Sequence, residues 1–342
     1  MPDVSHLRTP EPDAESAERG EPFVRHGIVI LPETRWRIAR ERWRAAEEFG
    51  FDHAWTHDHL MWRRLREKPW FGALPTLTAA AAVTSRIGIG TLVATPEYRH
   101  PVTFAKEVMT LDDISGGRFV CGLGSGAGGY DERALGGRPL SAGSRQRRFE
   151  EFVELTDLLL RRPETTYHGS WYHADGVQMR PGCLRRPRAP IAIAAAGPES
   201  MRLAVRYADI WVTNGTPGLF DPLPYRDVLP LLQRQLAALD EACAEAGRDP
   251  ATLDRMLVTG STTGGVLASV GAFQDASGLF GEAGFTDLVI NWPRDSPPYE
   301  GQLAVLEKVA GTLGTPGRAT PPGRTSGRPS WAEPPHTTAC VT

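Results

Sequence analysis

Short apolar stretches alternate with longer amphipathic stretches along most of this sequence. The clearest example runs from Arg86 to Gly126, where apolar residues at 87–94 and 119–123 flank a helical pattern at 101–114. Strands this apolar are buried on both faces, which is typical of parallel sheets with helices between the strands. This segment therefore predicts a strand–helix–strand unit, and the rest of the chain repeats it.

The same pattern predicts eight strands that alternate with eight helices. The strands are expected at 25–31, 51–57, 87–94, 119–123, 190–196, 209–213, 256–262 and 287–291. The helices are expected at 36–49, 74–84, 101–114, 144–161, from 198 onward, 229–246, 270–283 and 301–312. Eight such units predict an α/β protein with a (β/α)8 TIM barrel, which takes roughly 250 residues plus insertions. A doubly wound open sheet is the alternative, and it usually has fewer strands.

Three stretches do not fit this alternation. Residues 1–24 and 314–342 are rich in proline and polar residues and lack periodicity, so we expect a disordered arm and tail around a barrel of residues 25–313. Residues 163–190 contain aromatic residues, prolines and arginines. A long irregular segment of this kind is often a functional cover, so we expect it to be an insertion loop near the site.

The composition narrows the class of function. Hydrophobic residues make up 41% of the 342 and the formal net charge is -3, so the chain has no general attraction to nucleic acid or to an anionic membrane. No apolar run reaches the roughly 18 residues that a membrane helix needs, and the first residues do not read as a secretory signal. The four cysteines form no CxxC pair, and we expect reduced thiols in a cytoplasmic protein.

In a barrel of this type the active site lies at the carboxyl ends of the strands. One of these ends carries His57-Asp58-His59, with the two histidines on one side of the strand and the aspartate on the other. A histidine beside a carboxylate can donate or accept a proton near neutral pH. The HxH spacing also suits a metal site, but the later strand ends add no histidine or aspartate ligand, so no metal is expected. A polar cluster satisfied by loop backbone is the other interpretation.

Two further strand ends carry turns of small residues, Gly124-Ser125-Gly126 and Ala196-Gly197-Pro198. Glycines let backbone N–H groups approach a phosphate, and the N-terminus of a following helix attracts the anion. The first turn lacks the spacing of a dinucleotide fingerprint, and such turns often only close a loop. Two of them on one barrel indicate a phosphate-bearing cofactor. The aromatic residues that either wall a pocket or pack in the core are Trp55, Trp62, Tyr130, Trp211 and Trp292.

Three runs of the sequence resemble the bacterial luciferase-like flavin- or deazaflavin-dependent oxidoreductases. They are THDHL at 56–60, GTLVATPEYRHPVTFAKEVMTLDDISGGRFVCGLGSG at 90–126 and AAAGPESMRLAVRYADIWVT at 194–213. The resemblance extends over roughly residues 26–312. It implies a (β/α)8 barrel that is usually dimeric, with a redox cofactor that is either coenzyme F420 or FMN.

In the deazaflavin branch, the resemblance implies that Asp58 and His59 lie beside the reactive ring, with His59 as proton donor or acceptor. It also implies a non-proline cis peptide at Leu92-Val93 that supports the ring. Ala196-Gly197-Pro198 resembles the phosphate turn of the family. The cofactor contacts implied are Asp58, Trp62, Leu92, Val93, Thr95, Ser125, Gly126, Ala196, Gly197 and Pro198.

Other positions of the resemblance bear on structure and on substrate. Asp112 and Arg118 belong to the family signature and are expected to form an ion pair. The sugar-phosphate dehydrogenases of the family carry a glutamate where this chain has Ala127, which argues against a glucose-6-phosphate type of activity. The basic cluster Arg185, Arg186 and Arg188 is expected in a solvated loop, with an anionic substrate or cofactor tail as the alternative.

Together these patterns predict an oxidoreductase that uses coenzyme F420 for hydride transfer to or from a small organic substrate. The main alternative is a monooxygenase that uses reduced FMN and oxygen, with a flavin reductase as its partner. A cofactor-binding barrel without catalysis and a metallohydrolase are further alternatives. The DHL motif and the tryptophan after it favour coenzyme F420. We expect a cytoplasmic homodimer.

Overall fold

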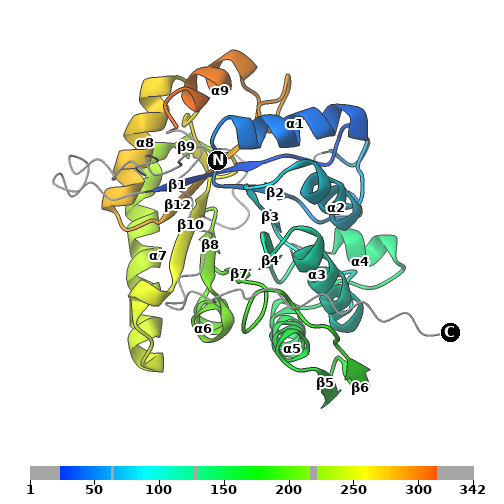
Figure 1. The fold of residues 1–342 in the computed structure, drawn as a ribbon. Helices are drawn as coiled ribbons and strands as arrows, with labels where there is room; N and C mark the ends of the chain where they lie inside the picture. The colour runs from blue at the N-terminus through cyan, green and yellow to red at the C-terminus, as the bar shows by residue number, and fades with distance from the viewer. Residues whose placement is uncertain (1–23, 63–64, 127–128, 216–221, 314–342) are drawn as a thin grey trace, which may run out of the picture.

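A computed structural model describes residues 24–62, 65–126, 129–215 and 222–313 of the chain (Figure 1). At its centre, eight parallel strands close into a barrel in the order β1-β12-β10-β8-β7-β4-β3-β2. Because β1 pairs with both β2 and β12, the first and last strands of the barrel meet. The predicted (β/α)8 barrel is confirmed, and the open sheet is wrong. The barrel strands are β1 (Arg25–Val29), β2 (His53–Thr56), β3 (Gly88–Thr91), β4 (Phe119–Leu123), β7 (Ile191–Ala194), β8 (Ile210–Thr213), β10 (Asp254–Val258) and β12 (Asp287–Asn291).

Helices surround the barrel in the predicted places (Figure 1). They are α1 (Trp36–Glu48), α2 (Ala73–Val83), α3 (Pro101–Ile114), α5 (Ala142–Arg161), α6 (Pro198–Tyr207), α7 (Tyr225–Ala246), α8 (Val270–Glu282) and α9 (Leu303–Ala310). The start of α7 precedes the predicted start at residue 229, so Pro230 lies inside this helix. A short helix, α4 (Tyr130–Ala134), follows the glycine-rich turn after β4.

Both faces of the barrel strands are buried, which explains their continuous apolar sequence. In β4, the side chains of Phe119 and Cys121 belong to the core between the barrel and its helices, whereas Val120 belongs to the core inside the barrel. The same division places Trp55 inside the barrel and Trp211 in the outer core. These two tryptophans therefore stabilise the fold. Trp292 also packs in the outer core, stacked on Phe49 with ring centroids 6.2 Å apart, so none of the three is a pocket wall.

The segment 163–190 forms a hairpin and does not cover the site. Its strands are β5 (Glu164–His168) and β6 (His173–Gln178), which pair antiparallel. The hairpin follows the end of α5 and precedes the start of β7, so it lies at the amino end of the barrel, below α5 in Figure 1. None of its residues lines either of the two cavities described below. The expectation of a functional cover is wrong because active-site covers come from the opposite barrel end.

One arginine of the basic cluster holds the barrel together instead of facing solvent. The Arg188 side chain is buried and donates from Nε to Asp157 and from Nη1 to Asp209, both at 2.6 Å. These contacts tie the end of α5 to the start of β8. The solvated-loop expectation is therefore wrong for Arg188.

Asp112 and Arg118 do not form the expected ion pair. The Arg118 guanidinium instead donates to the backbone carbonyls of Ala81 and Ile87 at 2.9 and 2.8 Å. Asp112 accepts a hydrogen bond from the N–H of Leu184 at 2.6 Å. Both side chains are thus structural, but each secures a different loop through backbone groups.

Where the barrel closes, three strands share a buried ionic network. The Asp287 carboxylate on β12 accepts hydrogen bonds from Arg25 on β1, at 2.6 and 2.7 Å, and from His53 Nε2 on β2, at 2.9 Å. Burial alone would raise the pKa of Asp287, but the hydrogen bonds from His53 and Arg25 hold it well below its usual range. Since His53 Nδ1 accepts from Trp55 Nε1 at 2.6 Å, the His53 proton lies on Nε2.

The remaining expectations concern thiols and termini. Cys121, Cys183 and Cys243 are buried free thiols, and burial raises the pKa of each. The expected terminal arm and tail, with Cys340, lie outside the described residues. Within the described ranges, no helix combines the length and apolar character needed to cross a bilayer.

Candidate active site

A cavity of about 650 Å³, the main cavity, opens at the carboxyl ends of the barrel strands. Its lining comes from the ends of β2, β3, β4, β7, β8 and β10, from residues of α4, α5 and α6, and from the loop that contains Tyr299. Two predicted site residues, Asp58 and Pro198, are not part of the lining. The predicted site residues that do line it are His59, Trp62, Leu92, Val93, Thr95, Ser125, Gly126, Ala196 and Gly197.

His59 is held by a carboxylate that the sequence analysis missed. Its Nδ1 lies 2.8 Å from Asp131 Oδ2, and the Asp131 side chain is only 1% exposed. The other oxygen of Asp131 accepts the N–H groups of Leu60 and Met61 at 2.9 and 3.3 Å. A carboxylate that holds one ring nitrogen fixes the tautomer and orients the other nitrogen. Because Nδ1 is bound to Asp131, the other ring nitrogen of His59, Nε2, is the one available to a molecule in the cavity.

Replacement of Asp131 by asparagine is expected to lower kcat by about tenfold or more, because an amide does not enforce the same His59 tautomer. The backbone contacts to Leu60 and Met61 can still form through the amide oxygen, so cofactor affinity should stay near that of the wild type. Steady-state kinetics with the titrated holoenzyme would measure both quantities. A variant with unchanged kcat would show that His59 does not depend on this carboxylate.

The Asp58 carboxylate does not reach the cavity. It is fully buried and accepts hydrogen bonds from Arg99 Nε and Nη2, both at 2.8 Å, and from the Tyr98 hydroxyl. Tyr98 and Arg99 belong to the loop between β3 and α3. Asp58 therefore holds that loop against the end of β2. It affects the site by positioning the residues beside it.

His57 is the second ring of the HxH motif in the cavity. It packs edge-on against Trp62 and Tyr299, with ring centroids 5.1 and 6.4 Å away. Burial, and then the nearby His59, lower the pKa of His57 to about 3. The ring is therefore neutral near pH 7. The prediction that His57 and His59 share one side of the strand is confirmed, since both line the main cavity.

This burial has a consequence for stability against acid. Between pH 6.5 and about 3 the unfolded chain binds a proton at His57 that the folded chain does not. The free energy of unfolding therefore falls as the pH falls, by up to about 1.4 kcal/mol per pH unit from this group. We expect His57→Gln to reduce the pH dependence of the free energy of unfolding, as measured by urea unfolding between pH 7 and 5. A matched His173→Gln variant, at an exposed position, should keep the wild-type slope.

The floor of the main cavity fits a flat, largely apolar ring. The Leu92–Val93 peptide is cis, as the family resemblance implied, and both side chains line the cavity. Opposite them, a Cβ at Gly124 would collide with the Val93 side chain, and a Cβ at Gly126 with Glu97. Gly126 also has a φ of 83°, which favours glycine. The close approach of these segments requires the small residues that the sequence provides.

The far side of the main cavity fits a phosphate. Gly197 caps the ten-residue helix α6, and Pro198 occupies its first position. Gly197 and Ser200 line the cavity beside the N-terminus of α6, whose N–H groups attract anions. Arg145 from α5 adds a positive charge to the lining.

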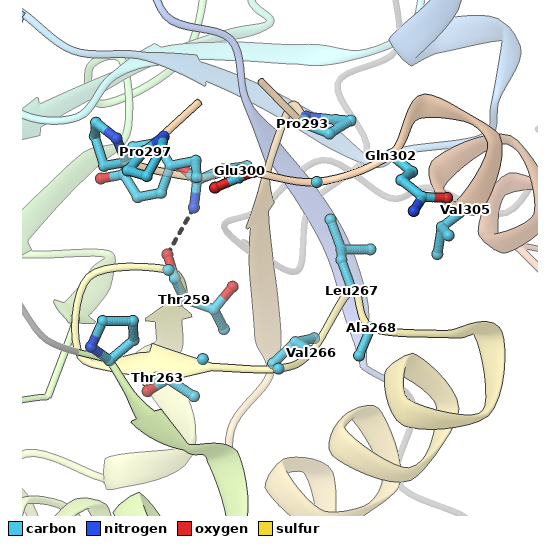
Figure 2. A pocket seen from close by; sticks show the side chains of 18 residues that line it. Thr259, Thr263, Val266, Leu267, Ala268, Pro293, Pro297, Glu300, Gln302 and Val305 are labelled. Atoms are coloured by element: carbon cyan, nitrogen blue, oxygen red, sulfur yellow. Dashed lines mark hydrogen bonds between the residues drawn. The ribbon is translucent and has the colours of Figure 1, made fainter. Parts of the chain in front are cut away.

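A second cavity of about 650 Å³ adjoins the first (Figure 2). It lies between the loop after β10 and the segment after β12, and Asn291 Nδ2 donates to the Thr259 carbonyl in its wall at 2.7 Å. Tyr299 lines both cavities. Its ring stacks on Trp62 at 5.8 Å between centroids, and Trp62 stacks on Trp70 at 6.1 Å. This aromatic wall was predicted only in its Trp62 component.

The described part of the chain holds no group of three or more histidine, cysteine or acidic side chains arranged to bind a metal ion. Ala127, the position that bears on sugar-phosphate substrates, lies outside the described residues.

Comparison with known proteins gives one family and several relatives. Residues 22–262 match the profile of the luciferase-like monooxygenase family. The chain is 35% identical over 222 residues to an F420-dependent glucose-6-phosphate dehydrogenase of Microbacterium testaceum, an alignment that covers 62% of this chain and 60% of the relative. It is 32% identical over 250 residues to an F420-dependent hydroxymycolic acid dehydrogenase of Mycobacterium tuberculosis, covering 72% and 63%. The chain thus spans about 60% of the length of these curated relatives.

Among solved structures, the fold matches that of an F420-dependent secondary alcohol dehydrogenase in complex with an F420-acetone adduct. The TM-score is 0.68 at 18% sequence identity, and the match covers 86% of this chain and all of the other. At this identity the match supports the fold alone.

Proposed function

The chain belongs to the luciferase-like monooxygenase family, and we propose that it is an oxidoreductase that uses coenzyme F420 for hydride transfer to or from a small organic substrate. The observation that carries the proposal is the His59–Asp131 pair, which lines the same cavity as the apolar side chains of Leu92 and Val93. The two F420-dependent relatives support the choice of cofactor.

The residues present fit this cofactor. Leu92, Val93 and Trp62 would hold its ring, and Ser125 and Gly126 would contact it from the end of β4. When bound, coenzyme F420 supplies a ring carbon that carries or accepts a hydride. Its phosphate-bearing part would meet Ala196, Gly197 and the first turn of α6.

The protein's own contribution is the proton that accompanies the hydride. His59 Nε2 would give this proton to the substrate or take it, because Nδ1 is already bound to Asp131. Trp62 and Tyr299 of the aromatic wall line the same cavity as His59. Thr95 and the buried Asp58 would keep the ends of β3 and β2 in place around the ring.

The alternative remains a monooxygenase that uses molecular oxygen together with reduced FMN, which a separate flavin reductase would deliver. The description of the family favours it, but both curated relatives above use F420. We also propose that the protein is a cytoplasmic homodimer, as the family resemblance implies. Light scattering coupled to size-exclusion chromatography would test the oligomeric state.

A fluorescence-quenching titration with coenzyme F420 and, in parallel, with FMN tests the proposal. We expect binding of F420 at micromolar concentrations and weak binding of FMN, with Trp62 in the lining as the reporter. Gly124→Ala should weaken F420 binding by about tenfold or more, since its Cβ would strike Val93. Gly278→Ala, whose Cβ would meet open space, is the control.

Each other result has a definite reading. Tight binding of FMN alone would make the monooxygenase the leading function, with oxygen consumption as the next assay. Binding of neither compound would overturn the cofactor assignment. If F420 binds, imines, enones and oxidisable alcohols are the compounds to screen as substrates.

A further inference from the structure

His57 faces the main cavity, and the proposed proton transfer gives it no role. Its ring centroid lies 6.4 Å from that of His59, at an interplanar angle of 83°, and both rings line the cavity. The two rings differ in their partners. His59 is bound through Nδ1 to Asp131, whereas His57 Nδ1 is buried and has no hydrogen-bond partner among the described residues.

The surroundings of His57 determine which nitrogen carries its proton. A proton on Nδ1 would be a buried donor without an acceptor, which is more costly than a buried acceptor without a donor. The proton therefore belongs on Nε2, and the ring lines the main cavity. Packed against Trp62 and Tyr299, the ring is uncharged near neutral pH. His57 thus offers a neutral N–H donor to whatever fills this part of the cavity.

We propose that His57 is a second catalytic residue, which donates a hydrogen bond from Nε2 to the carbonyl oxygen of a neutral ketone or aldehyde substrate, or to the oxygen of the corresponding alcohol. This inference rests on the proposed function, because hydride chemistry at a C–O bond needs a polarised carbonyl. A neutral histidine can polarise a substrate carbonyl in this way. His57 then binds and polarises the oxygen, and His59 handles the proton.

The charge of the site favours an uncharged acceptor. A carboxylate or phosphate at His57 would draw a second proton onto a ring whose burial disfavours charge. The lining near the end of β2 also contains the acidic Asp131, which would repel an anion. The positive charge in the lining, Arg145, comes from α5. A carbonyl or hydroxyl oxygen meets the donor without these costs.

The test uses cyclohexanone labelled with ¹³C at the carbonyl, added to the full-length protein with and without coenzyme F420. The bound carbonyl signal is expected downfield of its position in an apolar solvent, because a hydrogen bond polarises the C=O group. His57→Phe, which keeps an aromatic ring, should abolish this displacement and raise the Kd about three- to tenfold. His57→Gln, which keeps a neutral N–H donor, should retain most of the displacement and most of the affinity for cyclohexanone.

Several results would overturn the inference. A displacement that survives in His57→Phe and disappears in His59→Asn would assign the carbonyl to His59. Absence of any bound carbonyl signal would exclude the substrate class. If the NMR spectrum of wild-type protein labelled with ¹⁵N-histidine shows the His57 proton on Nδ1, then Nε2 is not a donor. The inference is then wrong, whatever the variants show.

The same experiment separates this inference from the proposed function. Cyclohexanone binding that depends on His57 in a protein without affinity for F420 would refute the cofactor assignment only. F420 binding together with a carbonyl signal indifferent to residue 57 would refute the role of His57 only.

Discussion

Replacement of His59 by alanine is expected to lower kcat by about 10²- to 10⁴-fold, the usual contribution of a positioned acid or base. The reason is that His59 is the ring in the main cavity whose remote nitrogen is fixed by a buried carboxylate. The affinity for coenzyme F420 should change little, because the proposed ring and phosphate contacts come from Trp62, from the ends of β3, β4 and β7 and from the first turn of α6, and not from His59. The absorbance change of the cofactor would follow turnover, with the substrate found by screening.

The matched control for this prediction is His173→Ala. His173 is an exposed histidine on the β5–β6 hairpin, at the opposite end of the barrel, so its loss should leave kcat unchanged. Undiminished turnover by His59→Ala would refute the proton role. If the wild type binds F420 but turns over no substrate, a cofactor-binding protein without catalysis becomes the favoured function. If the purified protein contains stoichiometric zinc, the metallohydrolase becomes a candidate again.

Replacement of Asp287 by asparagine is expected to lower the free energy of unfolding by about 3–5 kcal/mol, because it leaves Arg25 buried without its central partner. The substitution also replaces one of the two acceptor oxygens that Arg25 and His53 share with an amide N–H2 donor. The damage falls where β12, β1 and β2 close the barrel, so it should affect global unfolding and not one loop. Urea unfolding at pH 7 would measure the effect.

Asp275→Asn provides the comparison, because Asp275 forms an exposed ion pair with Arg226. Exposed pairs contribute little, so the unfolding midpoint should stay within experimental error. A small loss in Asp287→Asn would mean that Asp254, which lies 2.7 Å from Arg25, takes over the charge.

The sequence predicted the barrel well because its strands are buried on both faces. Continuous apolar runs and glycine-rich turns are local signals, and they locate β3, α3 and β4 within a few residues of their observed bounds. The hairpin of β5 and β6 escaped prediction because its strands are short, polar and mostly exposed. Tertiary packing, and not a local conformational preference, determines the structure of these residues.

The site was predictable in its positions but not in its partnerships. His59, Ser125 and Gly197 could be placed at strand ends from pattern alone. The Asp131 that holds His59 lies 72 residues away and comes from a five-residue helix, so no spacing rule connects them. The family resemblance, and not the pattern, implied that Asp58 lies beside the cofactor ring, whereas the partners of its carboxylate lie in the loop after β3.

The position of Tyr299 between two cavities also has a consequence for how this scaffold can diversify. Tyr299 has a φ of 66°, a backbone conformation that costs a tyrosine energy and a glycine almost none. Replacement of Tyr299 by glycine would therefore relax the backbone. It would also join the two cavities of about 650 Å³ each. The relaxed backbone would offset part of the stability lost with the ring's contacts to Trp62 and His57. This makes residue 299 the natural first position to randomise in directed evolution toward bulkier substrates.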